Sequence, residues 1–219
     1  MNCMRCLESI MKLDKAYRKY GLNAVLVHPS EWEFEKSKEN IAMAAKDLGI
    51  SLPIIVDRDR RIIKGMGVNF WPAQILFHDG KAIYRHIGEG EYKKLEDKIQ
   101  EIYGAKNKAV FSKEPIITRY PALYFGRRKG NFKFTYAGEW KQGKEYSEGK
   151  GVVIFPVKGR KVYVVAEATR KTRILVNKRQ KIDISYPGLY LIASFKRDIE
   201  REISIISNSK IRLYSAASL

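Results

Sequence analysis

The residues best suited to chemistry are Cys3 and Cys6, the only two cysteines of the 219-residue chain. The segment 7–20 repeats apolar residues at helical spacing, so we predict a helix that carries both thiols at its start and ends at Gly21. At a helix N-terminus the free N–H groups and the helix dipole favour a thiolate, and Arg5 adds a positive charge. We therefore predict that Cys3 attacks a disulfide and that Cys6 resolves the mixed disulfide.

Two other interpretations of the cysteine pair stay open. The pair could be half of a zinc site that two of the three histidines complete, although His28, His78 and His86 lack the usual spacing of metal ligands. Alternatively, Cys6 is a small core residue and the spacing has no functional meaning. We favour the redox interpretation, which requires no metal and no cofactor.

The charge of the chain differs between its two halves. The net charge is +18, with 17 Lys+Arg against 15 Asp+Glu in residues 1–104 and 25 against 9 in residues 105–219. Such a contrast predicts two modules with different partners. We place a first domain at residues 1–104, a linker at 105–118 and a second domain at 119–219.

The first module is predicted to alternate helices with strands. Strands at 22–28 and 53–57 flank a helix that Ser37 caps. After Pro72, a hairpin of two strands within 74–87 leads to a closing helix at about 91–103. This order of elements predicts an α/β fold with a parallel sheet and right-handed crossovers.

Several stretches of this module resemble the thioredoxin-like region of DipZ-type proteins, a TlpA-like branch of the thioredoxin fold. They are the C-x-x-C pair and the segments 28–35, 48–54, 71–73 and 86–90. The resemblance implies an α/β thioredoxin-like domain, here with its first β-strand missing from the numbered chain. It also implies thiol–disulfide oxidoreductase activity, with Cys3 as nucleophile and Cys6 as resolving cysteine.

The same resemblance implies further site residues. Pro72 is expected to be cis and to face the cysteines, and Trp71 is expected to supply an apolar wall and backbone groups for a bound substrate chain. Glu31 and Glu35 lie in a matching stretch and are additional candidates, although as charges at a helix entry they also have a purely structural explanation.

The second module changes to short alternating strands separated by glycine, asparagine and proline turns. Seven strands are predicted, at 132–136, 151–156, 161–166, 172–176, 189–195, 202–206 and 211–214. This pattern indicates an all-β sandwich or jelly roll. The stretches 121–126, 138–146, 162–165 and 211–215 resemble the carbohydrate-binding-like C-terminal module of DipZ-type proteins. Trp140 and Tyr146 could stack on a sugar, or equally belong to the core or its rim.

Three basic clusters, at 127–129, 170–173 and 178–181, carry part of the excess charge of the second half. They could contact a polyanion by charge alone, whereas a solvated lysine-rich surface explains them as well. We detect no DNA- or RNA-binding motif in the sequence.

From these observations we predict a thiol–disulfide oxidoreductase that exchanges disulfides with a protein partner and depends on a separate thiol or electron donor. The alternative is a non-catalytic binding protein whose basic β-sandwich engages a glycan or polyanion. The sequence contains no apolar run long enough for a transmembrane segment and no signal peptide. We therefore expect a cytoplasmic protein as numbered, or an extracytoplasmic one if an N-terminal membrane segment is missing.

Overall fold

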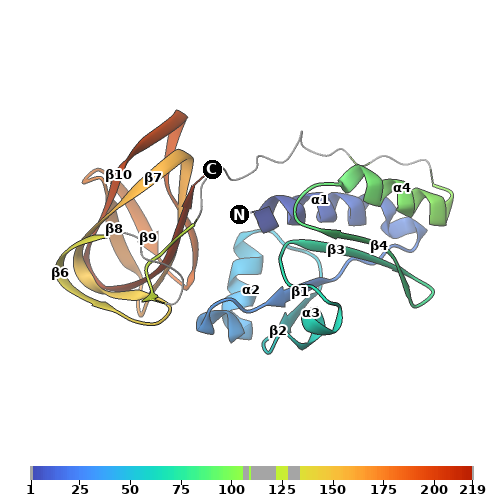
Figure 1. Ribbon diagram of the computed structural model, residues 1–219, viewed down its shortest axis with the longest axis horizontal. Coiled ribbons are helices and arrows are strands. Elements are labelled where there is room, and N and C mark those ends of the chain that lie inside the picture. The colour runs from blue at the N-terminus through green and yellow to red at the C-terminus, as the bar shows by residue number, and fades with distance from the viewer. Residues whose placement is uncertain (1, 106–108, 110–121, 128–133, 219) are drawn as a thin grey trace. The chain divides into compact units, whose positions relative to one another are not determined.

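The computed structural model describes residues 2–105, 109, 122–127 and 134–218 (Figure 1). The chain divides into two compact units, Met1–Ile116 and Ile117–Leu219. Most of the predicted linker at 105–118, and residues 128–129 of the first basic cluster, lie outside the described residues.

The first unit contains helices and short strands. Its described elements are, in order, α1 Asn2–Tyr17, the 3-10 helix η1 Arg18–Tyr20, β1 Leu26–Pro29, the 3-10 helix η2 Glu33–Lys36, α2 Lys38–Asp47, β2 Ile54–Asp57, α3 Arg61–Gly65, β3 Ala73–His78, β4 Lys81–Ile87 and α4 Tyr92–Tyr103.

The helix boundaries follow from local chemistry. The predicted cap of α2 is confirmed, because the Ser37 hydroxyl accepts a hydrogen bond from the N–H of Asn40 at 3.2 Å. At the end of η1, Gly21 has a φ of 105°, which few other residues adopt, and its N–H bonds to the carbonyl of Arg18 at 3.0 Å. The first helix, α1, begins at Asn2 and so carries both cysteines near its start, as predicted.

The core of the first unit packs α1 and α4 against the β3–β4 hairpin. Leu13 and Tyr17 of α1 meet Leu95 and Ile99 of α4, and all four side chains are buried. The Tyr17 hydroxyl also donates a 2.8 Å hydrogen bond to Glu96, which is itself buried. These contacts fix the position of the helix that carries the cysteines.

The strands of the first unit do not form one central sheet. β1 pairs with β2 in parallel, β3 pairs with β4 antiparallel, and in the described chain no ladder joins the two pairs. The described residues are 48% strand and 26% helix, with the large sheet in the second unit. The predicted α/β thioredoxin-like domain is therefore wrong. The order of elements located each strand, although β1 begins four residues later than predicted, but it says nothing of hydrogen bonds between strands that are not neighbours in sequence.

The second unit is antiparallel throughout. Its described strands are β5 Leu123–Tyr124, β6 Thr135–Gln142, β7 Ser147–Ala168, β8 Thr172–Val176, β9 Gln180–Ile184 and β10 Gly188–Ser218. They pair in the order β6-β7-β10-β8-β9, with β5 also on β10. The two longest strands bend and pair with each other along much of their length, which gives a β-sandwich that fits a jelly roll (Figure 1).

The prediction of seven short strands is wrong in their number and length. β7 takes up two of the predicted strands and β10 takes up three. Gly151 and Gly159 of β7 have φ of 118° and 134°, and the β7–β10 ladder shifts its register at several points and resumes after each shift. Gly151 and Gly159 therefore mark bends within β7 rather than loops between strands, whereas Gly143 and Asn177 do lie between strands.

Candidate active site

Cys3 and Cys6 lie on the first two turns of α1. Both are free thiols; Cys3 is exposed, whereas Cys6 is buried with 6% of its surface accessible. Residues three apart on a helix are neighbours, with Cβ atoms about 5–6 Å from each other. One accessible and one protected thiol therefore lie about one helical turn apart on α1.

Burial opposes ionisation of both thiols. Loss of water raises the pKa of Cys6 to about 11, and the charges of Cys3 and Glu89 act in the same direction. The pKa of Cys3 is also raised. The main cause is that the surrounding protein removes water from the thiol, although part of the residue is exposed, and the negative charges of Glu31 and Glu35 add to this effect. The predicted stabilisation of a thiolate by the helix N-terminus is therefore outweighed by desolvation.

Arg5 does not act on the cysteines as a free cation. Its Nε lies 2.7 Å from Oε1 of Glu89, and its Nη2 donates to Oε2 at 2.8 Å. The two side chains are 24% and 7% exposed, so the pair is partly withdrawn from water. The positive charge of Arg5, which the sequence led us to expect would stabilise a thiolate, is therefore balanced by the carboxylate of Glu89, 84 residues further along the chain.

The polar groups around Cys6 come from β3, from the segment between β4 and α4, and from the start of α4. Gln74 of β3 is 4% exposed and donates its amide to the carbonyl of Gly90 at 3.0 Å. The hydroxyl of Tyr92 and the amide of Gln74 lower the pKa of Cys6, against the larger effect of burial. Sequence reasoning missed Gln74, Glu89 and Tyr92 as site residues. Glu89 falls in the stretch 86–90 that resembles DipZ-type proteins, but no local pattern marks Gln74 or Tyr92.

Trp71 and Pro72 lie at the start of β3, next to the same segment. The peptide bond between them is cis, as predicted. The Pro72 carbonyl accepts a 2.8 Å hydrogen bond from the N–H of Gly88, one residue before Glu89. Arg60 stacks over the Trp71 ring at 5.3 Å, and Phe70 is 75% exposed. The Pro72 carbonyl is therefore bonded to the segment that contains Glu89, the partner of Arg5.

Glu31 and Glu35 lie in the turn that contains η2. The Glu35 carboxylate accepts hydrogen bonds from the N–H groups of Glu31, at 2.5 Å, and Trp32, at 3.0 Å. Burial raises the pKa of Glu35 to about 7, although these two bonds lower it. Glu35 thus caps this turn, and both carboxylates are close enough to act on Cys3 by charge.

The zinc interpretation finds no support in the described residues. His28, His78 and His86 lie on β1, β3 and β4 respectively. Within residues 2–105, 109, 122–127 and 134–218, no group of three or more His, Cys, Asp and Glu side chains could hold a metal ion.

None of the helices in the described part of the chain is long and apolar enough to cross a membrane.

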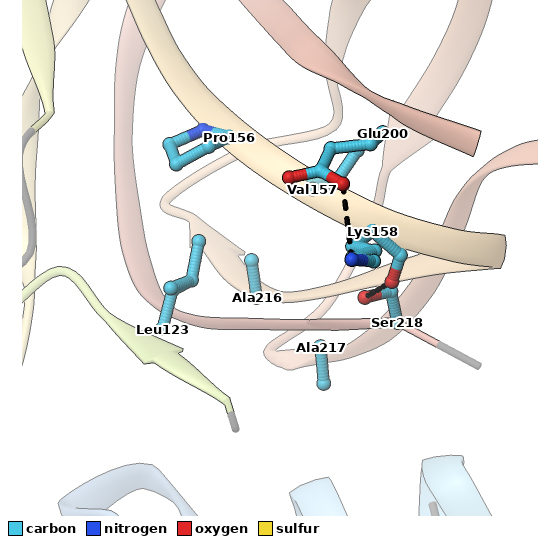
Figure 2. A pocket seen from close by; sticks show the side chains of 8 residues that line it. All are labelled: Leu123, Pro156, Val157, Lys158, Glu200, Ala216, Ala217 and Ser218. Carbon is cyan, nitrogen blue, oxygen red and sulfur yellow. Dashed lines mark hydrogen bonds and ion pairs between the residues drawn. The ribbon is translucent and has the colours of Figure 1, made fainter. Parts of the chain in front are cut away.

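The described residues of the second unit line a pocket of about 190 Å³ (Figure 2). It is lined by Leu123, Pro156, Val157, Lys158, Glu200, Ala216, Ala217 and Ser218. Figure 2 shows Lys158 and Glu200 turned toward each other, with Nζ and Oε2 3.0 Å apart. The remaining lining is mostly aliphatic, and none of the described lining residues is an aromatic ring on which a sugar could stack.

The aromatic candidates of the second unit are already engaged. Trp140 packs against the buried core, 5.5 Å from Tyr136. The Tyr146 ring is covered by Arg212 at 4.7 Å and meets Tyr214 edge-on at 5.2 Å. These contacts agree with a place in the core or at its rim.

The chain was compared with known proteins. No protein-family model matches it. It is 32% identical over 168 residues to Protein DipZ of Mycobacterium bovis and of Mycobacterium tuberculosis, an alignment that covers 71% of this chain and 23% of each DipZ. It is also 32% identical over 123 residues to the chloroplastic protein SUPPRESSOR OF QUENCHING 1 of Arabidopsis thaliana, covering 54% of this chain and 12% of that protein.

Solved structures gave weaker matches. A family two carbohydrate esterase from Cellvibrio japonicus aligns with a TM-score of 0.35 and 10% identity, over 44% of this chain and 32% of the esterase. A protein solved in work on glycan recognition by the Ruminococcus flavefaciens cellulosome aligns with a TM-score of 0.30 and 16% identity, over 45% of this chain and 92% of that protein. These scores are too low to establish a shared fold. The sequence alignments do establish that the chain is related to DipZ, of which it spans 23% of the length.

Proposed function

We propose that the protein is a thiol–disulfide oxidoreductase in which Cys3 and Cys6 exchange disulfides with a protein partner. The observation that carries the proposal is the placement of an exposed thiol one helical turn before a buried one, in a chain related to DipZ. A cysteine at the surface of the unit can reach a partner's disulfide, while a buried cysteine one turn further on can attack only a disulfide formed next to it.

The reaction proceeds in two displacements. The Cys3 thiolate attacks one sulfur of the partner's disulfide, forms a mixed disulfide and releases the other sulfur as a thiolate that takes up a proton. The Cys6 thiolate then attacks the Cys3 sulfur, forms the Cys3–Cys6 disulfide and releases the second partner thiol. The partner's disulfide gains two electrons and two protons, which the cysteine pair loses. A separate dithiol donor must return them.

In this proposal, Trp71 and Pro72 border the position of the mixed disulfide, and Phe70 adds an exposed aromatic surface beside them. Glu31 and Glu35 act on the nucleophile by charge. Residues 1–104 form the redox domain, and residues 119–219 form a second domain that does not take part in the exchange.

Single cysteine variants test this order of events. The full chain is mixed with an aromatic disulfide that releases a coloured thiol, and the products are weighed by mass spectrometry. The native chain should release two coloured thiols and lose two hydrogens, Cys6→Ser should stop as a stable adduct on Cys3, and Cys3→Ser should react slowly. An adduct on each cysteine of the native chain, with no internal disulfide, would contradict the proposal.

A further inference from the structure

The feature that goes beyond the exchange itself is the ion pair between Arg5 and Glu89. The carboxylate holds the guanidinium at two points, at 2.7 Å and 2.8 Å. Because the two side chains are only 24% and 7% exposed, water and salt screen this pair less than a surface pair. Arg5 directly precedes the buried Cys6 on α1.

An unpaired guanidinium at this position would favour ionisation of the neighbouring sulfur. With its charge balanced by Glu89, Arg5 exerts little such effect. The other groups that act on the Cys6 sulfur are Cys3 on α1, Gln74 on β3 and Tyr92 at the start of α4. None of these three is a cation, whereas the carboxylate of Glu89 itself raises the pKa of Cys6 by charge. Arg5 directly precedes Cys6 on α1, so its pairing with Glu89 determines the net charge beside this thiol.

We propose that Glu89 is a positioning residue for the thiol chemistry, which by binding Arg5 withholds a positive charge from Cys6 and thereby sets the reduction potential of the cysteine pair. The inference rests on the proposed thiol–disulfide exchange and deepens it, because it names the residue that determines how strongly the pair holds its electrons. A reduced pair whose sulfur is not stabilised as a thiolate gives up electrons more readily.

The test uses the full chain carrying Cys3→Ser, so that Cys6 is the only thiol, and follows its thiolate absorbance against pH. Glu89→Gln should free the charge of Arg5 and increase the thiolate fraction at a fixed pH by about threefold to tenfold, since one pKa unit is tenfold. Arg5→Gln leaves the negative charge of Glu89 without its cation and should decrease the thiolate fraction of Cys6. Opposite shifts are the signature of charge, because a loss of packing would move both variants in the same direction.

Three further variants serve as controls. Arg5→Lys keeps the charge and should titrate close to the parent, and the double variant Arg5→Gln/Glu89→Gln should fall between the two single variants. Glu91→Gln removes an exposed carboxylate that is paired with Lys94 and should change nothing. Shifts in the same direction for both single variants, or no shift in either, would overturn the proposal. Circular dichroism identifies any variant that fails to fold, and Arg5→Lys then still separates charge from shape.

The reduction potential provides a second readout in the chain with both cysteines. Equilibrated with a glutathione buffer, Glu89→Gln should favour the dithiol several-fold more than the native chain does. If the native chain never forms the Cys3–Cys6 disulfide, the proposed function fails, whereas the titration of Cys6 alone still decides the role of Glu89.

Discussion

Tyr17 of α1 donates its hydroxyl to the buried carboxylate of Glu96 of α4, with 2.8 Å between the two oxygens. The same hydroxyl accepts a hydrogen bond from Gln100, and Glu96 also accepts from the N–H of Ala109. This network joins the first and last helices of the first unit (Figure 1). It therefore holds the cysteine-bearing helix from its C-terminal end.

Tyr17→Phe should lower the stability of the first unit. The variant leaves a buried carboxylate with one donor fewer, which costs about 1–3 kcal/mol in the free energy of unfolding. Chemical denaturation followed by circular dichroism measures the change. Tyr20→Phe is the matched control, because Tyr20 is 37% exposed and should lose little. Equal stability of both variants would show that the Tyr17–Glu96 bond contributes nothing.

The stability of the first unit should depend on pH through Glu35. Burial raises the pKa of this carboxyl in the folded state to about 7, from an ordinary value of 4.5. Between these two values the folded state binds more protons than the unfolded state, so this contribution to stability falls as pH rises and is constant above about pH 7.

Denaturation midpoints of Glu35→Gln should lack this decrease between about pH 4.5 and about pH 7, because a neutral amide has no charge to bury. Glu33→Gln is the control, since the Glu33 side chain is 74% exposed. If the denaturation midpoint of Glu35→Gln fell with pH as steeply as that of the native chain, the pH dependence would come from a group other than Glu35.

The two cysteines should react with iodoacetamide at different rates. Cys3 is exposed, whereas Cys6 is 6% exposed and has a pKa raised to about 11. Cys3 should therefore be modified about tenfold faster than Cys6, or more. Peptide mass spectrometry after timed quenching gives both rates. In the denatured chain the difference should vanish, and equal rates in the folded chain would mean that Cys6 is not protected.

The local features of the site could be predicted from the sequence, and its long-range contacts could not. Helical periodicity and Gly21 placed the cysteines on α1, and Pro72 was correctly expected to be cis. Glu89 and Gln74 are 86 and 71 positions from Cys3 along the printed sequence, so only the tertiary fold brings them to the cysteine helix. The predicted low thiol pKa was wrong for the same reason, because desolvation depends on what packs over a helix end and not on the helix itself.

The stability of the second unit should depend on the ion pairs of Arg212. Its guanidinium bonds to Glu148 at 2.8 Å and to Glu167 at 3.2 Å, two carboxylates that are 26% and 20% exposed. Arg212→Met leaves both without their shared cation and should lower the free energy of unfolding by about 1–3 kcal/mol. Denaturation curves measure this loss.

The control for Arg212 is Arg173→Met. Arg173 binds Asp183 at 2.6 Å, but its own side chain is 60% exposed, and surface pairs contribute at most about 1 kcal/mol. A loss in Arg173→Met as large as that in Arg212→Met would contradict the importance given to partial burial of the Arg212 cluster.

The most direct test of the proposed function is a redox titration of the full chain. The protein is equilibrated with glutathione buffers of increasing oxidation, quenched and weighed. We predict one two-electron transition in which Cys3 and Cys6 lose two hydrogens together. Burial opposes the ionisation of both thiols, which makes the reduced pair less stable. The midpoint potential should therefore lie nearer about −270 mV, which is typical of a reducing dithiol protein, than about −120 mV, which is typical of an oxidising one. Glutathione adducts on the separate cysteines, without an internal disulfide at any ratio, would contradict the account.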